Sequence, residues 1–175
     1  MGELRKLIKW LDENIEYWLC FVFYSYMAGV IVVEVCRRYF FGASSSWGEE
    51  TAIYAFIWMT YLAAARGVRG RKHLSVEALR YRMTRTQKYY TFVLSDVCFF
   101  VLSVVIVYYS ILPVMENIRY GHTMFGIDLP LALATSAVTA GWILIAIRVV
   151  QRFFDTLKRF RHGLPLVDDL SLVED

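Results

Sequence analysis

The hydrophobic residues of this chain gather into four long blocks, separated by segments rich in charged residues. A helix needs roughly 20 mainly apolar residues to cross the hydrocarbon core of a bilayer. The four blocks lie at about residues 17–41, 47–66, 89–115 and 125–150, and each is long enough to cross. The pattern therefore predicts an all-α membrane protein with four transmembrane helices.

A different pattern precedes the first block. Over about residues 3–14, apolar residues recur every three or four positions, with basic residues between them. This spacing is typical of an amphipathic helix that lies along a membrane surface. We expect residues 1–162 to form a single transmembrane domain. The remaining residues, 163–175, form an acidic cytoplasmic tail without periodicity, which we expect to be disordered.

The positions of the basic residues predict the orientation of the four helices. Cytoplasmic segments of membrane proteins carry an excess of Lys and Arg. Of the nineteen Lys and Arg residues, all but Arg37, Arg38 and Arg119 lie before the first block, between the second and third, or from the end of the fourth block onwards. With four crossings these three segments fall on one side, so both termini are predicted to be cytoplasmic.

Composition agrees with a membrane protein and argues against several other classes. Hydrophobic residues make up 58% of the chain, against about 45–50% in soluble domains. The three cysteines form no C-x-x-C pair, and His73, His122 and His162 all lie outside the predicted mid-membrane regions. The sequence contains no nucleotide-binding loop and no nucleophile elbow. We therefore expect no enzymatic activity, no metal, no cofactor and no nucleic-acid partner.

Charged residues gather where the first block ends and the second begins. Glu34 precedes Arg37 and Arg38 by three and four positions, so the three side chains can share one face of a helix. Glu49 and Glu50 open the second helix, where carboxylates suit the positive end of the helix dipole. Because the connecting turn is short, we expect the two Arg and the three Glu to meet at one interface.

This charge cluster has two interpretations: an ion-paired membrane boundary that fixes the helix positions, or a docking surface for a partner. Aromatic residues near it would form part of the aromatic belt of the membrane, namely Tyr39, Phe40, Phe41 and Trp47. Asp96 in the third block raises a similar question. It either faces a partner subunit or caps the helix at the membrane interface.

The same residues resemble the signature of a known family. The segments EVCRRYFFG (34–42) and SWGEE (46–50) resemble motifs of the small, DctQ-like membrane subunit of TRAP (tripartite ATP-independent periplasmic) transporters. Further residues fit the family pattern through the last block: Trp58, Arg66, His73, Glu77, Pro130, Gly141 and Arg148. The resemblance therefore extends over nearly the whole chain.

The resemblance implies a non-catalytic small permease subunit in the bacterial inner membrane. Such transporters are sodium-coupled, depend on a binding protein and carry an organic acid, either a carboxylate or a sulfonate. The implied partners are a large elevator-type membrane subunit of about twelve spans, a periplasmic substrate-binding protein and membrane lipids. The small subunit would act as a scaffold for the large one and help to dock the binding protein.

The residues alone leave two other classes of protein open. A membrane anchor of a redox complex would need paired histidines near mid-membrane to hold a haem. A small oligomeric channel or exporter would need a polar stripe through at least one span, and only Asp96 offers such a group. The sequence therefore favours the transporter subunit.

Overall fold

The computed structural model of the protein describes residues 2–43, 45–69 and 83–164, with the backbone alone for residues 2–13 and 69. The fold is all-α, as predicted. Its helices are α1 (Gly2–Phe41), α2 (Ser46–Arg69), α4 (Arg85–Tyr120) and α5 (Leu131–Arg161).

Three of these helices contain segments long and apolar enough to cross a membrane: Asn14–Phe41, Arg85–Tyr120 and Leu131–Arg161. Helix α2 is not among them. Its 24 residues correspond to a length of about 36 Å at 1.5 Å per residue. Charged residues lie at both of its ends, namely Glu49, Glu50, Arg66 and Arg69, and the uncharged stretch between them, residues 51–65, is shorter than the roughly 20 residues that span a bilayer. A crossing by α2 therefore stays a prediction.

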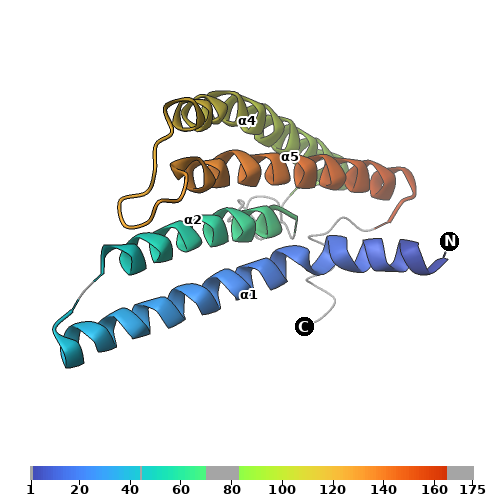
Figure 1. Ribbon diagram of the computed structural model, residues 1–175. Coiled ribbons are helices and arrows are strands. Elements are labelled where there is room, and N and C mark those ends of the chain that lie inside the picture. The colour runs from blue at the N-terminus through green and yellow to red at the C-terminus, as the bar shows by residue number, and fades with distance from the viewer. Residues whose placement is uncertain (1, 44, 70–82, 165–175) are drawn as a thin grey trace.

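The four helices form an open row rather than a closed bundle. Helix α1 packs on α2, α2 on α5, and α5 on α4, as Figure 1 shows. The two outer helices bury little of their surface within the chain. Only 6% of the apolar window is buried in α1 and in α4, against 33% in α5. The outer helices therefore present most of their apolar side chains to lipid or to another protein.

The inner pair, α2 and α5, supplies most of the core. Ala65 and Ala137 are fully buried, and Ala55 nearly so. At Gly141 an added Cβ would lie 2.4 Å from the Cβ of Tyr61, so these two helices cross closely. Small residues at such crossings allow helices in a membrane to pack without a hydrophobic driving force between them.

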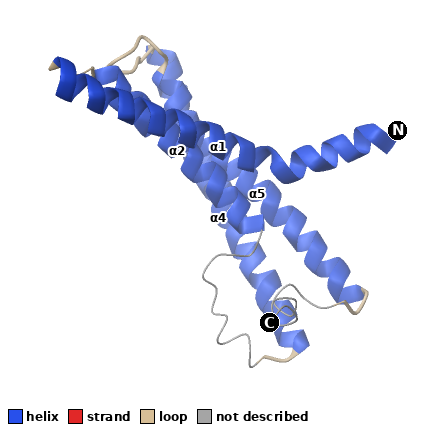
Figure 2. Cartoon of the chain, turned by 90° about the horizontal axis from the view of Figure 1, so that it is seen from below, coloured by secondary structure: helices blue, strands red, loops and turns tan. Residues whose placement is uncertain are grey.

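The beginning of the chain differs from the expectation. The surface helix expected at about 3–14 and the span expected at 17–41 are continuous in α1. Figure 2 shows the N-terminal part of α1 projecting away from the other three helices. The expected disordered tail lies outside the described residues from residue 165 onward.

The expected start of the last helix, at about residue 125, is wrong. Helix α5 begins at Leu131, and Pro130 occupies its N-cap position. The preceding loop is closed by backbone hydrogen bonds instead: the Met124 amide donates to Leu129, and Thr123 forms a bridge with Pro130. Proline fits beside the first helical residue because its missing N–H leaves no intrahelical bond unmade.

Candidate functional site

Polar side chains concentrate at two opposite ends of the helices: one group lies where α1 ends and α2 begins, and the other lies at the far ends of the same helices. At one end lies the boundary cluster, which comprises Glu34, Arg37, Arg38, Tyr39, Trp47, Glu49 and Glu50. At the other end lies a buried ion network, which comprises Glu16, Asp96, Arg148 and Arg152. The sequence pattern pointed to the first group but not to the connections of the second.

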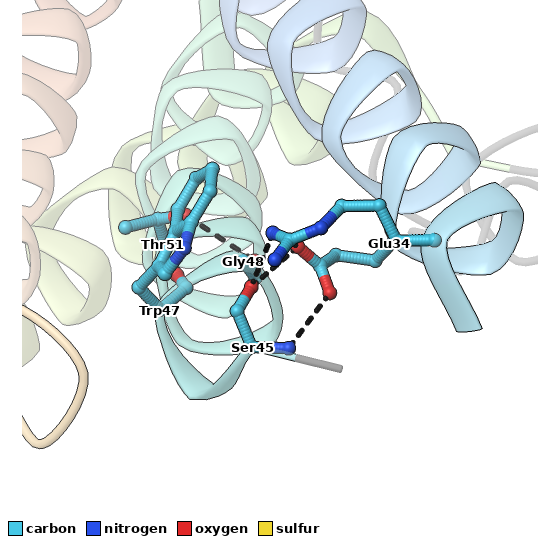
Figure 3. Close-up of polar contacts among 6 residues, drawn as sticks. Glu34, Ser45, Trp47, Gly48 and Thr51 are labelled. Carbon is cyan, nitrogen blue, oxygen red and sulfur yellow. Dashed lines mark hydrogen bonds and ion pairs between the residues drawn. The ribbon is translucent and has the colours of Figure 1, made fainter. Parts of the chain in front are cut away.

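Glu34 connects the end of α1 to the start of α2. Its buried carboxylate forms an ion pair with Arg37, with Nη1 3.1 Å from Oε1. The Ser45 backbone amide donates to Oε2 at 3.1 Å, and the Ser45 hydroxyl donates to Oε1 at 2.5 Å (Figure 3). Because the first N–H groups of a helix have no partner within it, a carboxylate from the neighbouring helix is well suited to hold this turn.

Two glycines allow the start of α2 to pack closely on both sides. A Cβ on Gly48 would lie 2.5 Å from the Cγ of Glu34, so this position accepts no side chain without moving the carboxylate. A Cβ on Gly126, in the α4–α5 loop, would lie 2.5 Å from the Cα of Trp47. The first turn of α2 is therefore held between α1 and the α4–α5 loop.

Glu50 reaches the α4–α5 loop and not the arginines of α1. It accepts hydrogen bonds from the backbone amides of Phe125 at 3.0 Å and Gly126 at 2.6 Å. The Tyr54 hydroxyl donates to the same carboxylate at 2.8 Å. The side chain of Phe125 is fully exposed at this loop.

The expectation that both arginines and all three glutamates meet at one interface is wrong in this form. Glu49 and Glu50 are consecutive on a helix and point about 100° apart, so Glu50 faces the loop while Glu49 lies beside α1. Arg38 and Glu49 are exposed, and neither makes a hydrogen bond or ion pair within the described part of the chain. Tyr39 is also exposed, at 81%.

The ion pair between Glu16 and Arg148 joins α1 to α5 at the opposite end. The Arg148 Nε atom lies 2.7 Å from Glu16 Oε1, and both side chains are at most 5% exposed. Gln151 accepts a further hydrogen bond from Arg148 at 2.7 Å. Removing two charges from water is costly unless they are paired and hydrogen-bonded, and this pair meets that condition.

Asp96 on α4 forms the second ion pair of the network, with Arg152 on α5. Arg152 also donates to the carbonyl of Val68 on α2 at 3.1 Å and lies over the ring of Phe99. Both expectations for Asp96, a partner-facing group or an interfacial cap, are wrong, because the residue is 1% exposed and faces α5. The network therefore involves all four helices.

One sequence signal could have revealed this network. Arg148 and Arg152 are four positions apart, so they share one face of α5. Two basic residues on one face of a span favour an acidic partner on a neighbouring helix, and Asp96 is the only acidic residue in the third block. Glu16 gave no such signal, because it lies among charged residues before the first block.

The residues of the family pattern also lie at contacts between helices. The Trp58 indole donates to the Leu133 carbonyl of α5 at 3.2 Å and stacks on Phe23 of α1. The Arg66 guanidinium lies 5.3 Å from the ring centroid of Tyr17. Pro130, Gly141 and Arg148 have the positions given above, and His73 and Glu77 lie outside the described residues.

These features define a helical integral membrane protein, in which polar contacts near both ends tie the helices to one another. Residues 27–159 match the sequence model of the family described as "Tripartite ATP-independent periplasmic transporters, DctQ component". The chain belongs to this family, and it is a small permease subunit of the TRAP transporter type.

Two relatives illustrate the range of the family. The chain is 24% identical to the "Isethionate TRAP transporter permease protein DctMQ" of Oleidesulfovibrio alaskensis, over 83% of this chain and 24% of the relative. It is 23% identical to a TRAP transporter small permease protein of Haemophilus influenzae, over 88% of this chain and 94% of the relative. The chain thus spans about a quarter of the length of the first relative and nearly all of the second.

Proposed function

We propose that this subunit is a non-catalytic scaffold for the large elevator-type subunit of a sodium-coupled TRAP transporter in the bacterial inner membrane. The transported compound is an organic acid, either a carboxylate or a sulfonate. The relative from Oleidesulfovibrio alaskensis is named for isethionate and for both DctM and DctQ. That name supports a large membrane partner beside this chain and makes isethionate the first compound to test.

The observation that carries this proposal is that the buried charged residues pair with one another across helix contacts. Glu16 and Arg148 pair with each other, as do Asp96 and Arg152, and both pairs lie near the same end of the row. A route for a polar solute needs polar groups that continue across the bilayer. Charges that instead tie helices together favour a rigid support, and the exposed apolar faces of α1 and α4 suit contact with a larger membrane protein.

We further propose four crossings with both termini in the cytoplasm. Gly126 lies close to Trp47, which supports an arrangement with the α1–α2 turn and the α4–α5 loop on the same side of the membrane. Nearly all Lys and Arg residues belong to the segments on the other side, and such segments remain cytoplasmic. Helix α2 lies between α1 and α5, and two of its polar side chains bond to protein neighbours: Glu50 to the α4–α5 loop and Trp58 to α5.

Reporter fusions test this topology. Alkaline phosphatase, which is active only outside the cytoplasm, is fused after residue 121, and a fluorescent protein that matures in the cytoplasm is fused at the C-terminus. We expect activity from the first fusion and fluorescence from the second. The opposite pattern, or a C-terminal fusion active outside the cytoplasm, overturns the four-span arrangement.

The boundary cluster then faces the periplasm, where we propose that it helps to dock the soluble binding protein. Glu50 holds the loop that displays Phe125, and Glu34 holds the turn beside it. A rigid surface loses little entropy on binding, so fixed turns are suited to a docking face.

Uptake measurements test the role of the whole subunit. Cells that make the large subunit and the binding protein are compared with and without this chain, with radiolabelled isethionate and a panel of carboxylates as substrates. We expect sodium-dependent uptake only when all three proteins are present. Undiminished uptake without this chain excludes the scaffold role.

A further inference from the structure

A hollow lies between the end of α1 and the start of α2, beside the Glu34 contacts described above. Its volume is about 100 Å³. The residues that line it are Ile31, Glu34, Val35, Arg38, Gly48 and Glu49. Three of these residues, Glu34, Arg38 and Glu49, belong to the boundary cluster, but the docking role proposed for that cluster assigns no occupant to the hollow.

The α1 side of the hollow is apolar at one end and charged at the other. Its residues lie at intervals of three and four, which places them along one face of the helix. Ile31 and Val35 are about half exposed, at 47% and 49%. From Ile31 to Arg38 the helix rises by about 10 Å, so the apolar end lies deeper in the membrane than the charged end.

Two charges of opposite sign at the charged end of the hollow, on Arg38 and Glu49, are free to bind a ligand. Glu34 is already neutralised by Arg37 and held by Ser45. Arg38 on α1 and Glu49 on α2 line the hollow from its two sides, and neither pairs within the described residues. A ligand for this place therefore carries an anionic and a cationic group, with an apolar part attached.

We propose that the hollow binds the headgroup of a zwitterionic phospholipid with a primary amine, of the phosphatidylethanolamine class. The planar guanidinium of Arg38 is suited to bind the phosphate through two hydrogen bonds. The Glu49 carboxylate accepts hydrogen bonds from the ammonium group, and an acyl chain lies along Val35 and Ile31. The exposed aromatic residues that follow, Tyr39 and Phe40, are of the kind found at headgroup level.

The same two charges set the selectivity of the site. An anionic glycerol headgroup has no cationic group for Glu49 and is repelled by it. A choline headgroup has the positive charge but no N–H to donate to the carboxylate. The expected order of binding is therefore ethanolamine first, choline second and glycerol last.

Native mass spectrometry of the purified full-length chain tests this order. The chain is delipidated in detergent and offered an equimolar mixture of phosphatidylethanolamine, phosphatidylcholine and phosphatidylglycerol, whose masses distinguish the bound species. We expect Arg38→Gln and Glu49→Gln each to reduce bound phosphatidylethanolamine by roughly fivefold, as expected for the loss of about 1 kcal/mol of a partly exposed charge contact. Glu49→Lys should shift the preference to phosphatidylglycerol.

Glu116→Gln and Arg119→Gln are matched controls. Both side chains are exposed charges in the last turns of α4, away from the residues that line the hollow. These variants should bind the three lipids as the unaltered chain does. Circular dichroism establishes that each variant is folded. The proposal is overturned if the unaltered chain shows no preference for phosphatidylethanolamine over phosphatidylglycerol, a comparison that requires no variant.

Two further outcomes also count against the proposal. Unchanged lipid binding by both Arg38→Gln and Glu49→Gln places the lipid elsewhere on the chain. Loss of co-purification with the large subunit in these two variants, without any change in bound lipid, makes a protein segment the occupant of the hollow.

Discussion

The Nε atom of Arg148 on α5 lies 2.7 Å from Oε1 of Glu16 on α1, and both side chains are almost completely buried. Helix α2 lies between these two helices in the row. The ion pair therefore closes one end of an arrangement that is otherwise open. Each outer helix of the row packs mainly on a single neighbour. The ion pair from α1 to α5 gives α1 a second attachment, beyond its packing on α2.

We predict that Arg148→Met destabilises the chain strongly, because it leaves Glu16 charged and buried without its main partner. Breaking a buried ion pair costs roughly 3–5 kcal/mol. The free energy of unfolding, measured in mixed detergent micelles with a graded denaturing detergent, should fall by about that amount. Replacing both partners, as in Glu16→Leu with Arg148→Met, should recover most of the loss.

The control for this pair is Lys158→Met, which removes an exposed charge from the same helix. It should leave the unfolding free energy within about 0.5 kcal/mol of the unaltered value. A double variant no more stable than Arg148→Met alone contradicts our account, because it would mean that the charges are not coupled.

A second prediction concerns Glu50. Its carboxylate holds the amides of Phe125 and Gly126, and hydrogen bonds to charged groups contribute roughly 1.5–3 kcal/mol. Glu50→Ala should therefore raise hydrogen exchange at these two amides by about tenfold or more, which mass spectrometry of the loop peptide can measure. Glu49→Ala is the matched control, because the Glu49 carboxylate is adjacent in sequence and makes no such hydrogen bonds within the described residues.

If Glu50→Ala leaves exchange in the loop unchanged, the loop is held by its own backbone bonds and Glu50 is not the support we assign. Exchange that rises throughout α5 as well would indicate general destabilisation. The comparison of the loop with the helix distinguishes these two results.

A third prediction links Gly48 to Glu34. An added Cβ at Gly48 would lie 2.5 Å from the Glu34 Cγ, so Gly48→Ala must displace the carboxylate from Ser45 and Arg37. Crowding of this kind costs about 1–3 kcal/mol. The free energy of unfolding is measured for Gly48→Ala, for Glu34→Ala and for the double variant. The loss in the double variant should be clearly smaller than the sum of the two single losses. Additive losses would show that the two residues do not share the contact.

The helix content and the general positions of the helices could be predicted from the sequence, because long apolar blocks leave few alternatives. The start of α5 could not. Residues 125–130 are apolar enough to extend the block, but the Met124–Leu129 hydrogen bond and the Glu50 carboxylate make them a loop. Such a contact joins residues far apart in the chain, and hydrophobic periodicity contains no information about it.

The site shows the same limit. Local spacing was sufficient to predict the Glu34–Arg37 pair, because its members are three positions apart on one helix. Spacing did not predict that Glu50 would face a loop 75 positions away from it in the sequence. Nor did it predict the pairing of Asp96 with Arg152, which depends on α4 and α5 packing side by side. The order of helices in the row decides these partners.

The crossing of α2 and α5 gives a final prediction. Because an added Cβ at Gly141 would lie 2.4 Å from the Tyr61 Cβ, Gly141→Ala must force the two inner helices apart. We expect a loss of about 1–3 kcal/mol in unfolding free energy. Gly29→Ala on α1 is the matched control, since its added Cβ meets nothing within 4 Å. It should be neutral or slightly stabilising, because alanine has the higher helix propensity. Equal stability of the two variants would mean that α2 and α5 do not cross at Gly141.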